Sequence, residues 1–120
     1  MSIPKIFESE YRFCCILWDN QPVSSSVLVQ LCAEKLGWKK STTYTVIKRL
    51  SERGVLKTEN AVVTALITRE QVQEQESREF VDKTFSGSLP QFLEAFTRHQ
   101  SLSREEIDQI QSLIDNYREV

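Results

Sequence analysis

The chain has 120 residues, of which 40% are hydrophobic and 27% are charged, an ordinary globular composition at the length of one domain with at most a small second part. No apolar run approaches the length of a membrane span and the N-terminus lacks signal-peptide organisation, so we expect a soluble, cytoplasmic protein without membrane insertion. The net charge of −2 is uneven: residues 1–68 carry nine Lys/Arg against six Asp/Glu, whereas residues 69–120 carry six against eleven, which indicates a local anionic partner for the first part.

Two helices are predicted in the first 36 residues. Apolar residues at helical spacing predict one over residues 9–19. They are Tyr11, Cys14, Leu17 and Trp18. Asn20 and Pro22 end this helix, and a second begins after Ser24 or Ser25 and runs to Leu36. One face of the second helix carries Leu28, Leu31, Cys32 and Leu36.

A third helix and a hairpin complete the first part of the chain. Gly37 and Gly54 suit the positions that follow a helix, and the third helix is predicted over residues 41–53. The β-branched stretches "VLKT" and "AVVTALIT", separated by Glu59 and Asn60, predict a small hairpin. Three helices and a hairpin in this order outline a winged helix-turn-helix domain over residues 1–68.

Residues 69–120 are predicted to be helical. "TREQ" and "SREE" have the form of capping boxes that open a helix over residues 69–85 and a last helix that carries apolar residues from Ile107 to Tyr117. A short helix over residues 89–99 lies between them. The fold class is therefore mainly α with a small β-hairpin: an N-terminal winged helix-turn-helix followed by a three-helix region.

The third helix has two chemically different sides on a helical wheel. Thr43, Val46, Ile47 and Leu50 fall together and are predicted to face the core. The opposite side carries Ser41, Thr45, Lys48 and Glu52, and its hydroxyls and cations can contact base edges and phosphates in a DNA major groove. Lys39 and Lys40 precede the helix N-terminus, where cations oppose the helix dipole unless an anion lies close. The serines that open the second helix also suit a phosphate contact.

Other interpretations of this pattern stay open. A solvated amphipathic helix can carry the same residues, and a winged helix can serve as a protein–protein interaction module without DNA binding. An enzyme is not expected, because no catalytic triad order or phosphate-binding glycine loop is present. Three cysteines without CxxC spacing and a single histidine give no metal site, and we expect no metal and no cofactor.

The segment "WKKSTTYTVIKRLSERGVL" resembles the recognition segment of the BlaI/MecI/CopY family of bacterial repressors, the penicillinase repressors. "EYRFCCILWDNQPVSSSVL" is similar to the first helix and turn of that family, and the stretch from "FVDKTF" to "IDQIQSLI" resembles its C-terminal half. The resemblance implies a transcriptional repressor that binds a double-stranded, dyad-symmetric DNA operator as a homodimer, with the recognition helix, about residues 41–53, in the major groove.

The resemblance also implies roles for particular residues. DNA contacts are expected from Lys39, Lys40, Ser41, Thr42, Tyr44, Thr45, Lys48 and Arg49. Dimerisation, over residues 69–120, is expected from Val81, Phe85, Leu89, Phe92, Phe96, Ile107, Ile110 and Ile114. The helices of this region are too poor in apolar residues for an independent core, and two copies would solve that burial problem.

Three departures from the family pattern matter. The Glu59-Asn60 turn gives the wing an acidic tip, which suits phosphate poorly. Residues 69–120 contain no cysteine, which argues against copper sensing. In the β-lactam-responsive branch a membrane sensor protease cuts an Asn-Phe bond, and the matching bond here is Ala95–Phe96; Phe96 equally suits a role in packing.

Overall fold

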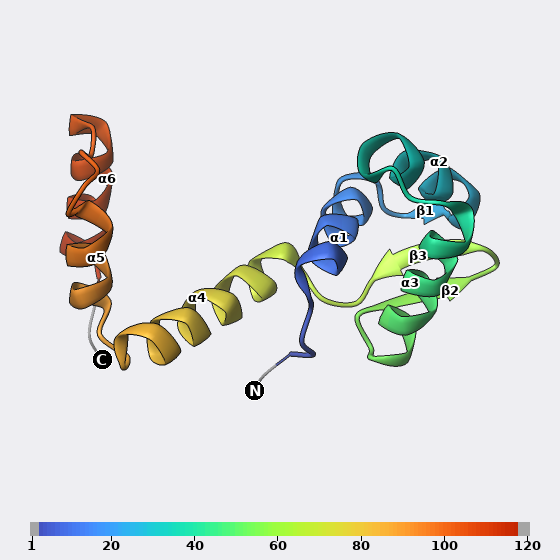
Figure 1. The fold of residues 1–120 in the computed structure, drawn as a ribbon, viewed down its shortest axis with the longest axis horizontal. Coiled ribbons are helices and arrows are strands. Elements are labelled where there is room, and N and C mark those ends of the chain that lie inside the picture. The colour runs from blue at the N-terminus through green and yellow to red at the C-terminus, as the bar shows by residue number, and fades with distance from the viewer. Residues whose placement is uncertain (1–2, 118–120) are drawn as a thin grey trace. The chain divides into compact units, whose positions relative to one another are not determined.

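The computed structural model describes residues 3–117, and this part of the chain forms six helices and three short strands (Figure 1). The mainly α fold with a small β element is confirmed. The chain divides into two compact units between Ser77 and Arg78. The first unit has the element order of a winged helix-turn-helix, and the second contains the end of one long helix and two shorter helices.

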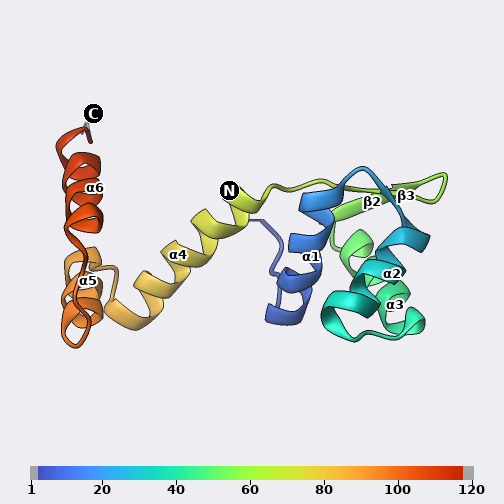
Figure 2. The ribbon, with the colours of Figure 1, turned by 90° about the horizontal axis from the view of Figure 1, so that it is seen from above.

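The three helices of the first unit are α1 (Glu8–Asn20), α2 (Ser25–Leu36) and α3 (Lys40–Glu52). Each begins and ends within one residue of its prediction. The Ser24 side chain accepts a hydrogen bond from the Val27 N–H and so caps α2. Gly37 follows α2 with φ 68°, a left-handed conformation that glycine adopts without a steric penalty. Figure 2 shows these helices on one side of the small sheet.

The sheet contains three antiparallel strands in the order β1 (Val23–Ser24), β3 (Val62–Ala65), β2 (Leu56–Glu59). The predicted hairpin is confirmed, but its turn is Asn60-Ala61 rather than Glu59-Asn60. Glu59 pairs with Val62 and belongs to the strand. Both turn residues have positive φ, 53° and 63°, as a two-residue hairpin turn of matching twist requires. Sequence patterns miss β1, since two residues carry no periodicity.

The core of the first unit lies between the helices and the sheet. Its fully buried large side chains include Phe13, Leu17, Leu28, Leu50, Leu56 and Val63. The Phe13 ring stacks on Trp38, which lies in the α2–α3 link, with ring centroids 6.1 Å apart. One charged residue, Glu10, is also buried and forms an ion pair with Arg53 across 2.5 Å. This pair ties the start of α1 to the residue that follows α3.

The remaining helices are α4 (Arg69–Phe85), α5 (Leu89–Thr97) and α6 (Arg104–Asp115). Thr68 and Gln71 form the predicted capping box at α4, and Ser103 and Glu106 form the one at α6. The predicted helix over 89–99 ends earlier, at Thr97. Val72 of α4 is buried in the core of the first unit. In contrast, no residue between 78 and 117 is buried.

The core cysteines should be chemically inert in the folded protein. Burial, with smaller contributions from Cys15 and the Glu10 carboxylate, raises the pKa of the Cys14 thiol to about 12, and burial also raises the pKa of Cys32. Because the thiolate is the reactive form, we expect iodoacetamide at pH 8 to leave Cys14 and Cys32 unmodified in native protein and to label both in denaturant. Peptide mass spectrometry after a timed reaction measures this, and native labelling of Cys14 as fast as in denaturant would contradict it.

Candidate nucleic-acid interface

The inner side of α3 is fixed by burial. Thr43, Val46, Ile47 and Leu50 are all buried, which confirms the face predicted from the helical wheel. Three of them are apolar, and each fully buried aliphatic side chain contributes about 1.5–3 kcal/mol relative to exposure. Rotating α3 about its axis would expose these side chains and bury charges. The opposite side of the helix therefore points away from the core.

The side chains predicted to contact DNA all lie on this exposed part of the structure. They are Lys39, Lys40, Ser41, Thr42, Tyr44, Thr45, Lys48 and Arg49, and every one of them is exposed. Lys39 is the N-cap of α3 and Lys40 its first residue, so the helix begins one residue earlier than predicted. Seven of the eight thus belong to one helix, and the eighth is its N-cap residue.

This surface carries four cations and, at the end of α3, one exposed carboxylate, Glu52. Among residues 3–117, no carboxylate forms an ion pair with Lys39, Lys40, Lys48 or Arg49. The wing differs, because Lys57 Nζ lies 3.2 Å from Glu59 Oε1 in an exposed pair. The positive charge available to an outside anion is therefore concentrated on α3 and not on the hairpin.

The N-terminus of α3 lacks a side-chain acceptor. Helices α2, α4, α5 and α6 begin with Ser24, Thr68, Ser88 and Ser103, and each hydroxyl accepts a backbone N–H of the first turn. Lys39 cannot do this, and α3 has no side-chain cap. Its first backbone N–H groups have no side-chain cap within residues 3–117, and such a helix N-terminus beside cations favours an anion.

The serines before α2 are only partly available for such a contact. The Ser24 hydroxyl accepts from the Val27 N–H at 3.2 Å and lies 3.2 Å from the Ser26 hydroxyl. Ser25 is half-buried, whereas Ser26 is exposed. Of the three, Ser26 has the side chain freest to meet an external group.

The residues predicted to serve dimerisation lie in α4, α5 and α6, and none is buried. Leu89, Phe96, Ile107 and Ile114 are between 48% and 57% exposed. Val81, Phe85, Phe92 and Ile110 are half-buried. Phe80, Phe85, Phe92 and Phe96 form a chain of ring contacts with centroids 5.6–6.0 Å apart. A groove of about 190 Å³ runs between α5 and α6, and Phe92, Phe96 and Ile110 line it. These apolar side chains therefore contact one another but remain at least partly exposed.

The Ala95–Phe96 bond lies within α5, near its C-terminal end. Ala95 is half-buried, and its carbonyl accepts the Arg98 N–H at 3.4 Å. The Phe96 ring contacts Phe92 with centroids 6.0 Å apart. A helical bond is not in the extended form that proteases bind, so local unfolding of α5 would have to precede cleavage there.

Sequence analysis missed the residues that connect the C-terminal end of α3 to α1. Glu10 accepts the Phe7 N–H at 3.0 Å as well as the Arg53 guanidinium. The Arg53 guanidinium also lies over the Phe7 ring, 5.7 Å from its centroid. Glu10 lies on the side of α1 toward the core, and a carboxylate at such a position requires a cationic partner. This rule predicts that Glu10 has a cationic partner, but it does not identify Arg53 as that partner.

The first unit is a winged helix-turn-helix whose third helix presents an unpaired cationic and hydroxylic surface. The sequence model of the penicillinase repressor family matches residues 6–116, and the chain belongs to this family. Membership makes it a transcriptional regulator of the repressor class and not an enzyme. Among the helices of residues 3–117, none combines the length and apolar character needed to cross a bilayer.

Named relatives extend over nearly the whole chain. It is 22% identical over 115 residues to the methicillin resistance regulatory protein MecI of Staphylococcus aureus, covering 92% of this chain and 94% of that protein. It is 22% identical over 120 residues to the penicillinase repressor of Bacillus licheniformis, covering 97% and 94%. It is 30% identical over 114 residues to an uncharacterized 16.5 kDa protein of Latilactobacillus sakei, covering 92% and 78%.

Replacing Thr43 by Val tests the buried side of α3 and leaves its exposed side unchanged. The Thr43 hydroxyl is buried without a nitrogen or oxygen partner in the described part of the chain, beside the Cys32 thiol. Because a thiol is only a weak hydrogen-bond partner for a buried hydroxyl, we expect Thr43→Val to leave the free energy of unfolding unchanged or to raise it by up to about 1 kcal/mol. Urea unfolding of this variant beside the exposed-side control Thr45→Val measures the effect, and a loss of 2 kcal/mol or more for Thr43→Val would contradict it.

Proposed function

We propose that this protein is a sequence-specific DNA-binding repressor that acts as a cytoplasmic homodimer on a dyad-symmetric operator. Helix α3 enters the major groove, and the winged helix, predicted over residues 1–68, carries the DNA contacts. The helical region, predicted over residues 69–120, joins the two copies. The relatives are named as a methicillin resistance regulator and a penicillinase repressor, which supports the regulatory assignment.

The observation that carries the proposal is the exposed side of α3. It offers Ser41, Thr42 and Thr45, whose hydroxyls can donate to or accept from base edges, in the first half of the helix. Lys48 and Arg49 follow one turn later, where they can neutralise phosphates or bind guanine. The free N–H groups at the start of α3, beside Lys39 and Lys40, supply a further phosphate contact.

The second unit supports the homodimer. Residues 78–117 contain no buried side chain, yet several large apolar side chains are at least half exposed. They include Phe80, Leu89, Ile107, Ile114 and Tyr117. Large apolar side chains left exposed in such number are typical of an interface, because contiguous apolar patches are rare on monomers. A second copy would cover it and would present two α3 helices about one DNA turn apart, as a two-fold operator requires.

Removing the α3 cations tests the DNA contact. We expect Lys48→Ala and Arg49→Ala each to weaken operator binding by ~1–3 kcal/mol where the side chain binds a base, or to lower the salt dependence by about one counter-ion where it meets phosphate. Fluorescence anisotropy on operator and unrelated duplexes at several salt concentrations measures both effects. Lys35→Ala is the charge-matched control, because Lys35 is exposed at the end of α2, off the α3 surface.

The outcome separates DNA binding from the alternative of a protein–protein module. Salt-dependent retention of the wild-type chain on duplex DNA, lost in the two α3 variants and kept in Lys35→Ala, supports the proposal. If wild type binds no duplex at low salt, or if both α3 variants bind as wild type does, α3 is not the DNA-binding element.

The dimer is tested by a charge in the groove between α5 and α6. We expect Ile110→Asp to shift the protein from dimer to monomer and to weaken operator binding without any change in α3, because a carboxylate buried at an apolar interface costs several kcal/mol. Analytical ultracentrifugation measures the dimer, and Gln109→Asp places the same charge on an exposed neighbour as the control. An unaltered dimer in Ile110→Asp would remove that residue from the interface.

A further inference from the structure

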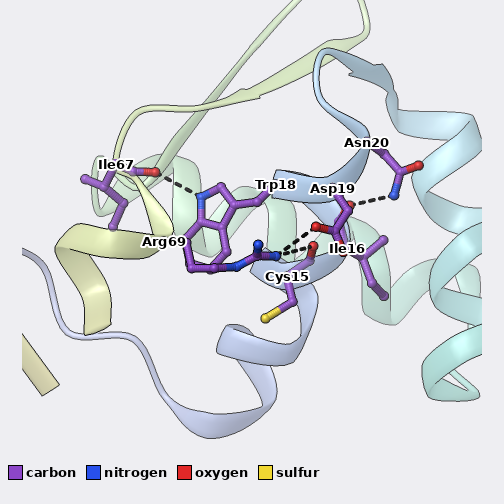
Figure 3. Close-up of polar contacts among 7 residues, drawn as sticks. All are labelled: Cys15, Ile16, Trp18, Asp19, Asn20, Ile67 and Arg69. Atoms are coloured by element: carbon purple, nitrogen blue, oxygen red, sulfur yellow. Dashed lines mark hydrogen bonds and ion pairs between the residues drawn. The ribbon is translucent and has the colours of Figure 1, made fainter. Parts of the chain in front are cut away.

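The first residue of α4 is held on α1 by three contacts of one side chain (Figure 3). The Arg69 guanidinium donates to Asp19 Oδ1 at 2.9 Å and to the Cys15 carbonyl oxygen at 3.4 Å. It also lies over the Trp18 ring, 5.4 Å from the centroid. The hydrogen bonds fix the guanidinium within its own plane, and the Trp18 ring fixes it perpendicular to that plane.

Trp18 joins this arrangement to the segment that leads into α4. Its indole N–H donates to the Ile67 carbonyl oxygen at 3.0 Å, and its ring makes an edge contact with Tyr11 at 5.7 Å. The same indole therefore holds the chain two residues before α4 and the side chain of its first residue (Figure 3). We call Trp18, Asp19 and Arg69 the α4 clamp.

Two further residues of α4 face the same way. Val72 is 2% exposed, in the core of the first unit. Gln75 exchanges two hydrogen bonds with the backbone of Ile3, at 2.8 Å and 3.1 Å. Arg69, Val72 and Gln75 are spaced three residues apart and lie on one side of the helix. The first two turns of α4 are thus attached to the winged helix at three successive points.

We propose that the α4 clamp is a positioning device that fixes the direction in which α4 leaves the winged helix and thereby restricts the half-site separations that a dimer accepts. This inference rests on the proposed function. It assigns Arg69, Asp19 and Trp18 a role in operator selection although none of them belongs to the α3 surface.

Because α4 is long, a small rotation at its first residue would produce a large displacement at its last. α4 runs without interruption from Arg69 to Phe85, a span of about 24 Å at 1.5 Å per residue. A rotation of roughly 20° at its base would move its far end by about 8 Å. That exceeds two base-pair steps of roughly 3.4 Å each. A loosened base would therefore tolerate half-site separations that a fixed base rejects.

A role in stability alone would be small. The Asp19 side chain is 65% exposed and that of Arg69 is 34% exposed. Exposed ion pairs of this kind typically contribute only ~0.2–1 kcal/mol. The clamp is better suited to orienting one element than to holding the fold together, and the two roles differ in what they predict.

The test uses the full chain and a set of duplexes. Half-sites are selected from a random duplex pool with wild-type protein and then placed in pairs whose separation increases by one base pair at a time. We expect wild type to prefer one separation sharply, since each added base pair also turns the second half-site by roughly 35°. In Arg69→Gln and Asp19→Asn we expect this preference to fall about fivefold or more, a loss of ~1 kcal/mol.

Other measurements should not change. Binding to a duplex with one half-site and the dimer in sedimentation should match wild type in both variants. Arg69→Lys keeps the charge beside Asp19 and should recover part of the preference. Arg98→Gln is the matched control, because Arg98 forms only an exposed pair with Glu94 at 3.6 Å within one helix. It should keep the wild-type profile.

Hydrogen exchange tests the clamp independently of DNA. Backbone amides of residues 70–77 should exchange at least several-fold faster in Arg69→Gln than in wild type, with the amides of α1 and α3 unchanged. Trp18→Phe, which keeps a ring but loses the indole N–H, should give a smaller increase of the same kind.

The results separate the two proposals. If wild type binds no duplex, the proposed function fails and operator positioning fails with it, whatever the exchange data show. If wild type binds paired half-sites but both clamp variants keep its separation profile, the positioning role is overturned while the repressor assignment stands. Unchanged exchange of residues 70–77 in Arg69→Gln would also overturn the clamp.

Discussion

The burial of one side of α3 is the constraint on which the rest of the structure depends. Thr43, Val46 and Ile47 are held in the core of the first unit, and the Glu10–Arg53 ion pair fixes the end of the helix from behind. The opposite side, with its hydroxyls and unpaired cations, is consequently exposed. The apolar pattern of α3 determines which residues are exposed, because a helix that buries one face must expose the residues of the opposite face.

The two units differ in how much apolar surface they bury on their own. The first contains all the buried side chains of residues 3–117 and forms a complete core around Phe13, Leu17 and Leu50. The second arranges its aromatic residues in contact but buries none of them. Its apolar surface needs a partner, and a second copy is the proposed one. If the proposed dimer forms there, folding of this unit would be coupled to assembly.

Helix α4 contributes residues to both units and forms the covalent connection between them. Its N-terminal turns are bound to α1 and to the N-terminal segment through Arg69, Val72 and Gln75. The proposed role of the α4 clamp depends on this anchored base, because a continuous helix is stiffer than a flexible linker. Val72 is a core residue, whereas Arg69 and Gln75 are half-buried and act through hydrogen bonds and a ring contact.

The sequence by itself determined the helices, the buried side of α3 and the exposure of the residues predicted to contact DNA, because helical periodicity and capping are local properties. It also indicated that residues 69–120 lack an apolar core. Only the tertiary structure decided the Asn60-Ala61 turn, strand β1, the Glu10–Arg53 pair and the Arg69 contacts. Each of these joins residues distant in sequence or needs a backbone conformation without a strong residue signature, and local pattern carries no information about such partners.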